Sequence, residues 1–452
     1  MNLMPISRKN RGLGFVYAFL VAALFTSSFD IFLVLNLGFN FRISQILLLI
    51  PIGLAVANIV QKKRAIWPLG FGWLLLWTMI IITFVPNTYF LARSIGYALW
   101  LLFNVFAIFA FVQFISTPSK AVGLVRWYVY SFVFVAVFGL IQFVSPLAGL
   151  GNNLLITQWW FYGILPRVNG FSYEPSYFAT YLLMGWVVCA YLLQSKSTLF
   201  TRTHLQFYFL TISLALVLST SRMGILMMLI WYIQYPLQLL VRLGLGHFNK
   251  RFFRITIIVL GVMLFLILLV IFVIGLDKLL FLFSGLGIFD TSSHSISERK
   301  VRMMDTLSLF INSPVIGYSL GGIGPAIAHL HGVTNIDFVA VKTYEGMCIF
   351  LEVLAASGLF GFIPFAIFIF LMVSRPLRLA RKVLSEQSKI LVALTLALIF
   401  ELVILQFNQN ILRPYLWLHL AVLAASYSVF KRRYKSIERA GTEALILATE
   451  HD

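Results

Sequence analysis

The stretch PRVNGFSYEPSYFATYLL, Pro166–Leu183, joins a polar turn directly to an apolar helix. Its first half contains Arg167, an Asn-Gly turn pair and Glu174. Its second half begins an apolar run that we assign to residues 177–194. A helix needs about 20 mostly apolar residues to cross a bilayer, so this run predicts a membrane span. The stretch therefore predicts charged groups at a boundary between membrane and water.

The composition of the whole chain indicates that lipid is its solvent. Of its 452 residues, 61% are hydrophobic and 11% are charged, whereas a soluble domain is about 45–50% apolar. The first apolar stretch lacks the small-residue cleavage site of a signal peptide, so we expect a retained helix. Cys189 and Cys348 both lie in apolar segments, which predicts neither a disulfide framework nor a cysteine metal site. We therefore expect a single, all-α integral membrane domain over residues 1–452.

Apolar runs predict about twelve spanning helices. The division between the seventh and eighth is the least secure, because only STSR separates them. The predicted spans are 14–35, 43–60, 67–86, 94–116, 124–146, 177–194, 205–220, 223–241, 255–276, 347–373, 390–409 and 414–430.

Lys and Arg are unevenly distributed among the loops between these spans. One alternating set of loops holds most of the 34 Lys and Arg residues, including RKNR near the N-terminus and KRRYK after the last span. Loops rich in Lys and Arg face the cytoplasm, so we expect both termini inside. The net charge of +19 is then a topology signal and an attraction to anionic lipid headgroups, with no nucleic-acid partner implied.

This orientation places two long segments, 147–176 and 277–346, on the outer side. Long segments in compact proteins are commonly functional. We expect the second to cover a site, with its glycine-rich run GYSLGGIG as a flexible element. The tail, 431–452, is polar and cytoplasmic, and we expect no domain in it.

Basic residues on the outer side run against the charge trend and are candidates for binding an anion. Arg222 lies in LSTSRMG, where Ser221 and its neighbours end one helix and Gly224 lets the next approach. An Arg held by short polar residues can offer a fork of donors to a phosphate. The outer segments add Arg167, Arg299 and Arg302. For three others we expect interfacial side chains that extend towards water: Arg42, Arg93 and Arg413.

Glu174 has two interpretations. An acidic residue at a helix start complements the helix dipole, and Pro175 suits the first helical position. Alternatively, a carboxylate beside Arg167, Tyr173 and Tyr177 could bind a sugar or act as a general base.

Other acidic and aromatic residues are weaker candidates. Glu352 lies in the tenth span and belongs either to the site or to pairing within the bundle, while Glu401 and Asp30 are assigned to packing or polar pairing. His329 and His331 in AHLHG lack a third ligand nearby, so a solvated loop is favoured, with His331 kept as an alternative base. Tyr344 is a further substrate-binding candidate. The chain has no Walker A motif and no outer acidic pair, so we expect neither cofactor nor metal.

Four segments together resemble the O-antigen polymerase and ligase superfamily. PRVNGFSYEPSYFA resembles its Arg, Gly, Glu-Pro and Ala segment, and LSTSRMG resembles its S-x-S-R-x-G segment. In the third, Arg299 precedes the P-x-x-G turn at Pro314 by fifteen residues, as in the family. FLEVLAASGLFGF resembles the fourth, with Ala356 where Glu is common.

The resemblance implies a GT-C-like glycosyltransferase of the bacterial inner membrane. It would act at the periplasmic face on undecaprenyl-diphosphate-linked glycans, as donor and as acceptor, without a metal. Arginines would hold the diphosphate, which matches the interpretation of Arg167, Arg222 and Arg299 from the residues alone. A flippase and a chain-length regulator are the implied partners.

One departure bears on the branch of this family. Its ligases carry His-Asn about eleven residues before the Gly of the fourth motif, where this chain has Met347 and Cys348. The chain therefore looks more like a polymerase for O-antigen, capsule or exopolysaccharide. Two alternatives stay open: a ligase that transfers the glycan to lipid A–core, and a flippase or other transporter.

Overall fold

The computed structural model of the protein describes most of the chain. The described residues are 8–36, 40–62, 65–149, 154–161, 165–244, 294–338, 344–407 and 411–449, with the single positions 253, 254, 257, 261 and 341.

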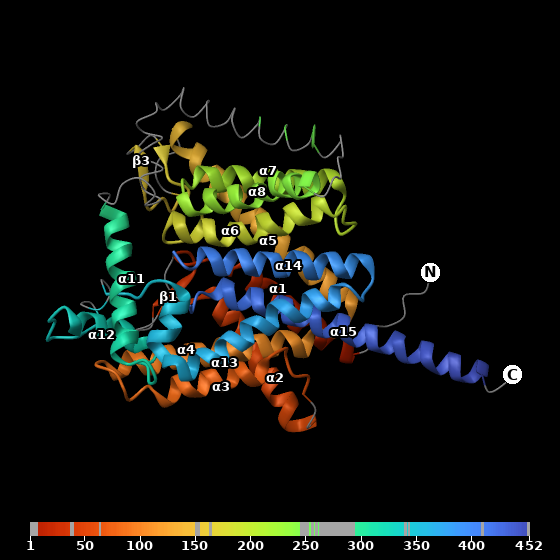
Figure 1. Ribbon diagram of the computed structural model, residues 1–452, viewed down its shortest axis with the longest axis horizontal. Helices are drawn as coiled ribbons and strands as arrows, with labels where there is room; N and C mark the ends of the chain where they lie inside the picture. The colour runs from red at the N-terminus through yellow and green to blue at the C-terminus, as the bar shows by residue number, and fades with distance from the viewer. Residues whose placement is uncertain are drawn as a thin grey trace.

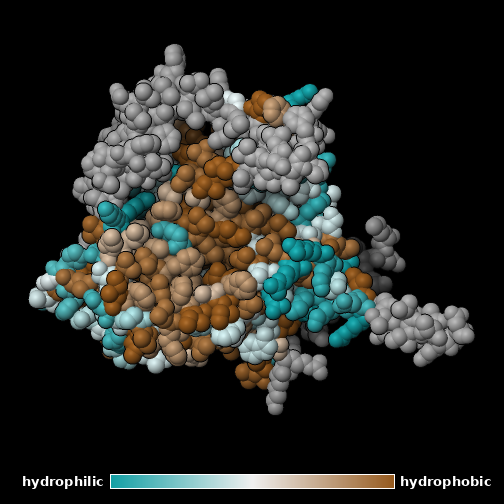
Figure 2. All heavy atoms as spheres, in the orientation of Figure 1, coloured by the Kyte–Doolittle hydropathy of each residue, from teal (hydrophilic) through white to brown (hydrophobic). Residues whose placement is uncertain are grey.

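The protein is an all-α membrane protein whose long helices run side by side (Figure 1). Six described helices are long and apolar enough to cross a membrane: α2 (Ile43–Lys62), α4 (Leu91–Phe114), α5 (Pro118–Leu147), α6 (Pro175–Gln194), α13 (Ile349–Ala380) and α14 (Ser385–Ile404). The other long helices are α1 (Arg8–Phe25), α3 (Phe71–Thr83), α7 (Arg202–Leu218), α8 (Arg222–Gly244), α11 (His294–Asn312) and α15 (Pro414–Thr449). Figure 2 shows a face that is hydrophobic in its middle with hydrophilic residues at both sides, as a lipid surrounding requires.

Eleven of the twelve predicted spans coincide with helices. The ninth, 255–276, lies outside the described residues apart from positions 257 and 261. The first span is wrong in its second half, because α1 ends at Phe25 and Val34–Asn36 (β1) pairs antiparallel with Asn40–Arg42 (β2). Thr26 donates both its backbone N–H and its hydroxyl to the Ala22 carbonyl, at 3.1 and 2.9 Å, and the chain leaves the helix at this point.

Helix α6, which begins next to Glu174, is the most enclosed of the six candidate spans, with 83% of an 18-residue stretch buried inside the protein. It packs against α14, α5, α7 and α8. Gly185 lets α5 approach closely, because a Cβ there would lie 2.3 Å from the Phe132 ring. The middle of α6 is therefore closely packed against α5.

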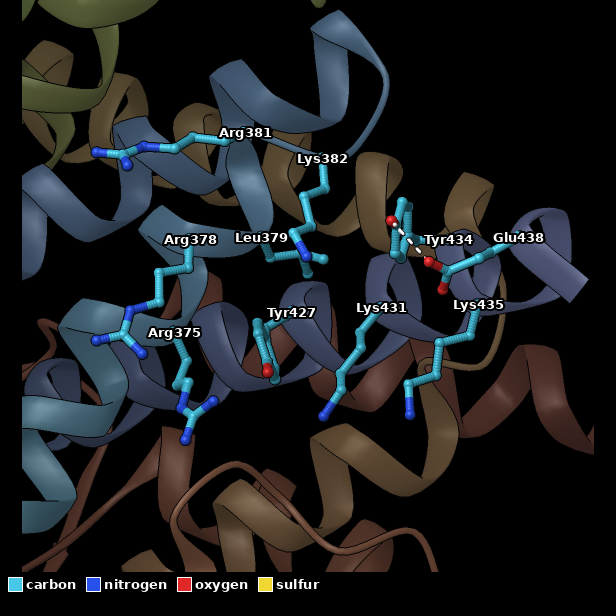
Figure 3. A pocket seen from close by; sticks show the side chains of 10 residues that line it. All are labelled: Arg375, Arg378, Leu379, Arg381, Lys382, Tyr427, Lys431, Tyr434, Lys435 and Glu438. Carbon is cyan, nitrogen blue, oxygen red and sulfur yellow. Dashed lines mark hydrogen bonds between the residues drawn. The ribbon is translucent and has the colours of Figure 1, made fainter.

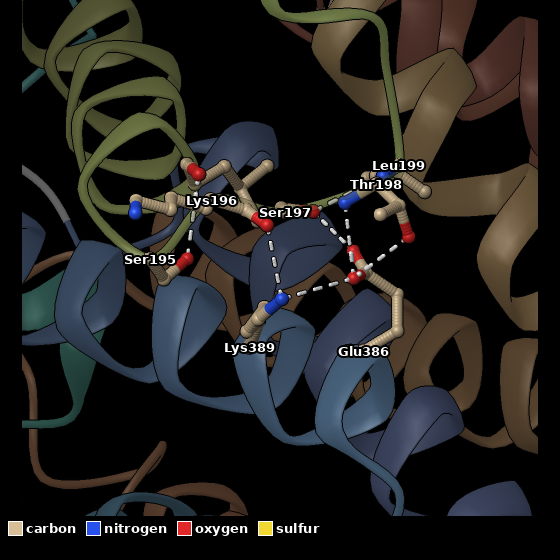
Figure 4. A network of polar contacts seen from close by, with 8 residues as sticks. Ser195, Lys196, Ser197, Thr198, Leu199, Glu386 and Lys389 are labelled. Atoms are coloured by element: carbon tan, nitrogen blue, oxygen red, sulfur yellow. Dashed lines mark hydrogen bonds and ion pairs between the residues drawn. The ribbon is translucent and has the colours of Figure 1, made fainter.

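The connection between α6 and α7 is attached to α14 at the far end of α6 (Figure 4). The Glu386 carboxylate accepts hydrogen bonds from the backbone N–H and hydroxyl of Thr198, both at 3.0 Å, and from the Ser197 hydroxyl. Lys389 donates to the Lys196 carbonyl at 3.0 Å. These contacts fix the end of α6 opposite to Glu174.

The second predicted outer segment contains helix α11, the short helix η1 (Leu320–Gly322) and α12 (Ile323–Leu330). The expectation of a flexible glycine run is wrong. A Cβ at Gly317 would lie 2.1 Å from the Ala356 backbone, and one at Gly321 would lie 2.5 Å from Ser94 Cα. The glycines permit close backbone packing here, and the run is buried. The tail beyond residue 431 continues α15 to Thr449.

Candidate functional site

Four charged residues from four separate segments come together at one end of the bundle. Arg167 follows the strand β4 (Leu165–Pro166), Glu174 precedes α6, Arg222 begins α8 and Arg299 lies in α11. The charges of Arg222, Glu174 and Arg299 all act on Arg167, and those of Glu174 and Arg222 act on Arg299. We call these four residues the arginine cluster. It joins the first three segments that the sequence resemblance singled out.

The arginine cluster holds more positive than negative charge. Burial lowers the pKa of Arg167, and Arg222 and Arg299 lower it further, whereas Glu174 raises it. Burial also lowers the pKa of Arg299, with Glu174 opposing and Arg222 and Arg302 adding to the effect. Arginines stay protonated in proteins, so the cluster bears the cost of like charges held close together. A bound anion would relieve that cost.

Arg167 is oriented by neutral partners that leave its charge uncancelled. Its Nε donates to Thr220 Oγ1 at 2.8 Å, and its Nη1 donates to Gln158 Oε1 at 2.9 Å. Its backbone N–H donates to the Gln158 carbonyl at 3.0 Å. The Thr220 contact links the first motif directly to the second. The fork of Arg167 is thus preorganised before any ligand arrives.

The Asn-Gly turn predicted after Arg167 is present and tightly packed. Asn169 is buried, and its amide donates to the carbonyls of Leu155 and Ser172 at 3.0 and 2.7 Å. Gln142 Oε1, from α5, accepts the backbone N–H of Gly170 at 2.9 Å. Sequence reasoning missed Gln142, although a glutamine inside an apolar span is a visible signal. The turn fixes the spacing between Arg167 and Glu174.

We expect Gly170→Ala to destabilise the protein more than Gly149→Ala. Both glycines have positive φ, +56° and +72°, so each substitution adds about 1 kcal/mol of backbone strain. At Gly170 the new Cβ would also lie 2.6 Å from the Phe178 ring, whereas nothing lies within 4 Å at Gly149. Overpacking adds about 1–3 kcal/mol. Equal melting temperatures for the two variants in thermal unfolding would contradict this packing.

Glu174 occupies the N-cap position of α6, but its side chain makes no cap hydrogen bond. Instead its Oε2 accepts a hydrogen bond from the Ser176 hydroxyl at 3.0 Å. The half-buried carboxylate lies among the cations of the arginine cluster. A role at the helix start is therefore limited to the favourable interaction of the carboxylate with the helix dipole, which typically contributes about 0.3–1 kcal/mol.

Arg222 is positioned by the turn between α7 and α8. The Ser219 hydroxyl accepts the Ser221 backbone N–H at 3.2 Å, and the Ser221 hydroxyl accepts the Gly224 N–H at 3.4 Å. A Cβ at Gly224 would lie 3.2 Å from Ala179 Cβ on α6, which confirms the predicted close approach. Ser221 is buried, and its visible role is to orient the start of α8 and with it Arg222.

A second charged group adjoins the arginine cluster through Tyr177. The Arg413 guanidinium lies 3.6 Å from the centre of the Tyr177 ring, and its Nη1 is 3.2 Å from Asp30 Oδ2. Arg42 Nε is 2.7 Å from Asp30 Oδ1. The predicted polar pairing of Asp30 is confirmed. The prediction that Arg42 and Arg413 simply extend towards water is wrong, because one buried carboxylate binds both.

Asp30→Asn is expected to lower the free energy of unfolding by about 3–5 kcal/mol, because it removes one partner from buried ion pairs. The side chain of Asp30 is only 4% exposed, and Arg42 and Arg413 would face each other without it. Adding Arg42→Gln to the variant should recover part of the loss. Thermal unfolding that is unchanged in Asp30→Asn would contradict this assignment.

Arg93 and Glu352 lie in a different group. Arg93 is 6% exposed, donates to Tyr97 at 2.9 Å and pairs with Glu345 at 2.6 Å, so the prediction that it extends to water is also wrong. Buried Glu352 acts electrostatically on Tyr97 and lies against Gly346. The structure thus groups Glu352 with Arg93.

The remaining candidates are His331, Tyr344, Tyr173 and Arg302. His331 Nε2 is 3.0 Å from Asp305 Oδ2, and the His331 ring stacks against Tyr344 at 5.6 Å. Tyr173 is 63% exposed, and Arg302 acts on Arg299. Within the part of the chain that the structure describes, no group of three His, Cys, Asp or Glu side chains could hold a metal ion.

Comparison with known proteins adds no family to this description. No protein-family model and no curated protein matches the chain.

Proposed function

We propose that the protein is a polysaccharide polymerase of the bacterial inner membrane. It joins undecaprenyl-diphosphate-linked repeat units of an O-antigen, capsule or exopolysaccharide at the periplasmic face. The convergence of Arg167, Arg222 and Arg299 around Glu174 carries the proposal. A glycosyl transfer from a lipid diphosphate needs cations for the leaving group and a base for the acceptor, and this cluster supplies both.

The arginines bind the donor through its diphosphate. Negative charge grows on the diphosphate as the glycosidic bond breaks, and fixed cations stabilise that charge without reorganising. A guanidinium also presents parallel N–H donors that fit phosphate oxygens. Arg167 is already oriented by Thr220 and Gln158, while Arg299 and Arg302 approach from α11.

Glu174 activates the acceptor. A hydroxyl oxygen of the second repeat unit attacks the anomeric carbon of the donor, and its proton passes to the Glu174 carboxylate. The bond from the anomeric carbon to the diphosphate oxygen breaks, and undecaprenyl diphosphate leaves with the electron pair. The Ser176 hydroxyl holds one carboxylate oxygen and so orients the base. A single displacement of this kind inverts the anomeric configuration.

Lipid-linked intermediates distinguish this proposal from its alternatives. Cells that lack the protein should accumulate undecaprenyl-diphosphate carrying one repeat unit on the periplasmic leaflet. Loss of a ligase would instead leave long lipid-linked polymer, and loss of a transporter would leave single repeat units on the cytoplasmic leaflet. Mass spectrometry of the extracted lipids measures the length of the lipid-linked glycan. Enzymatic labelling of the outer leaflet shows which leaflet carries it. Either of the latter two patterns contradicts a polymerase.

A further inference from the structure

A basic pocket lies at the end of α13, on the side of the molecule away from α11 (Figures 1 and 3). It is a cavity of about 460 Å³ between the last turns of α13 and the second half of α15. Both helices begin near α11 and run to the other side of the molecule (Figure 1). Six cations line the pocket: Arg375, Arg378, Arg381, Lys382, Lys431 and Lys435.

The spacing of these cations brings like charges together. Arg375 and Arg378 lie three residues apart on α13, Arg381 and Lys382 follow directly after its end, and Lys431 and Lys435 lie four residues apart on α15. Like charges at such spacings destabilise a helix. Glu438 is the one carboxylate among the lining residues, and it accepts a hydrogen bond from the Tyr434 hydroxyl at 3.1 Å. A preference for basic loops on the cytoplasmic side does not require two helices to direct their cations at one cavity.

The floor of the pocket is aromatic and apolar. Tyr427 and Leu379 are buried beneath the cations, and Lys431 Nζ lies 5.5 Å from the centre of the Tyr427 ring. In Figure 3 the head groups of Arg375, Lys431 and Lys435 lie along one side of the pocket, while Arg381 extends away. The pocket thus offers several donors from two helices above a floor that keeps water out.

We infer that the basic pocket binds a multiply charged phosphate group. Six lining cations against one carboxylate, arranged around a cavity of this size, fit a group with two phosphates or one phosphate and further oxygens. The pocket lies where the apolar helices end, at the predicted cytoplasmic boundary of the membrane. A dianionic lipid headgroup and a free diphosphate share this chemistry. This inference does not depend on the proposed polymerase activity.

The test compares two triple variants of the full-length protein in neutral phosphatidylcholine nanodiscs. Arg375→Gln, Arg378→Gln and Lys431→Gln remove three charges from the pocket. Arg202→Gln, Arg433→Gln and Arg439→Gln remove three exposed charges outside it. Diphosphatidylglycerol is incorporated in one series, and inorganic pyrophosphate is added to another. Binding is measured by native mass spectrometry and by the shift in melting temperature.

The pocket variant should bind its ligand about 100-fold more weakly than wild type, since each cation near an anionic headgroup contributes roughly a factor of five. The control variant should lose less than about threefold in affinity for each charge removed, because exposed charges outside the pocket are screened by salt. Selective loss of diphosphatidylglycerol binding supports a lipid headgroup, and selective loss of pyrophosphate binding supports a soluble phosphate. Equal losses in both variants, or no binding of either probe by wild type, would overturn the inference.

Discussion

Arg222→Ala and Arg299→Ala are each expected to reduce polymer formation by about 10²–10³-fold, the usual effect of removing one group that stabilises transition-state charge. Both residues act on the charge of Arg167, and in the proposed mechanism both contribute to binding the diphosphate. Both variants should remain folded in the membrane, because loss of either guanidinium group relieves repulsion between like charges in the cluster. Polymer from cells carrying each variant is measured on gels against protein level in isolated membranes.

Two further substitutions sharpen this prediction. Arg222→Lys should also be poorly active, because a point charge cannot reproduce the two parallel donors of a guanidinium. Lys300→Ala is the matched control, since Lys300 adjoins Arg299 on α11 and is exposed as Arg299 is, while the charges that act on Arg167 include Arg299 and not Lys300. Wild-type polymer from Arg222→Ala or Arg299→Ala, or an equal loss in Lys300→Ala, would contradict the role of the cluster in diphosphate binding.

Glu174→Gln is expected to reduce turnover by about 10²–10⁴-fold, the range for loss of general base catalysis. The amide keeps the size of the side chain and can still receive the Ser176 hydroxyl, but it cannot take a proton. Donor binding should be retained or strengthened, because the change removes the negative charge that partly offsets Arg167 and Arg299. Turnover and donor affinity are therefore measured separately in purified protein.

The melting temperature separates catalysis from structure at this position. Glu174 makes no cap hydrogen bond to α6, so Glu174→Gln should unfold close to the wild-type temperature. Ser176→Ala is the comparison, because it removes the partner of the carboxylate and should reduce turnover only modestly. An active Glu174→Gln protein, or one that is inactive because it is unfolded, would return Glu174 to a role at the helix start.

The helices were largely predictable from the sequence because lipid demands long apolar runs. The clearest failure is the first span. Its apolar residues continue past Phe25, but the helix ends at the polar run Thr26–Ser28, and Val34–Asn36 forms a strand instead. Hydropathy averaged over a window does not register three small polar residues. The prediction that the glycine run at 317–324 is flexible failed for a different reason, because glycine allows close packing as well as flexibility.

The residues of the arginine cluster could be named from the sequence, but the contacts of the residues next to the cluster could not. Arg167 and Arg222 stand out as outer charges beside short polar residues, and the structure joins them through Thr220. The pairing of Arg413 with Asp30 spans 383 residues of sequence, and no local pattern indicates it. An interfacial Arg that extends to water and one that is held by a buried carboxylate look the same in a single sequence.

The most direct test of the central claim is a reaction with purified components. The protein in nanodiscs is given its cognate undecaprenyl-diphosphate repeat unit as sole substrate, with a chelator and without ATP, and the products are separated on a gel. The account predicts a ladder of polymers from wild type, and no ladder from Arg222→Ala. A ladder that persists in Arg222→Ala, or folded wild-type protein that leaves authenticated substrate unchanged, would contradict it.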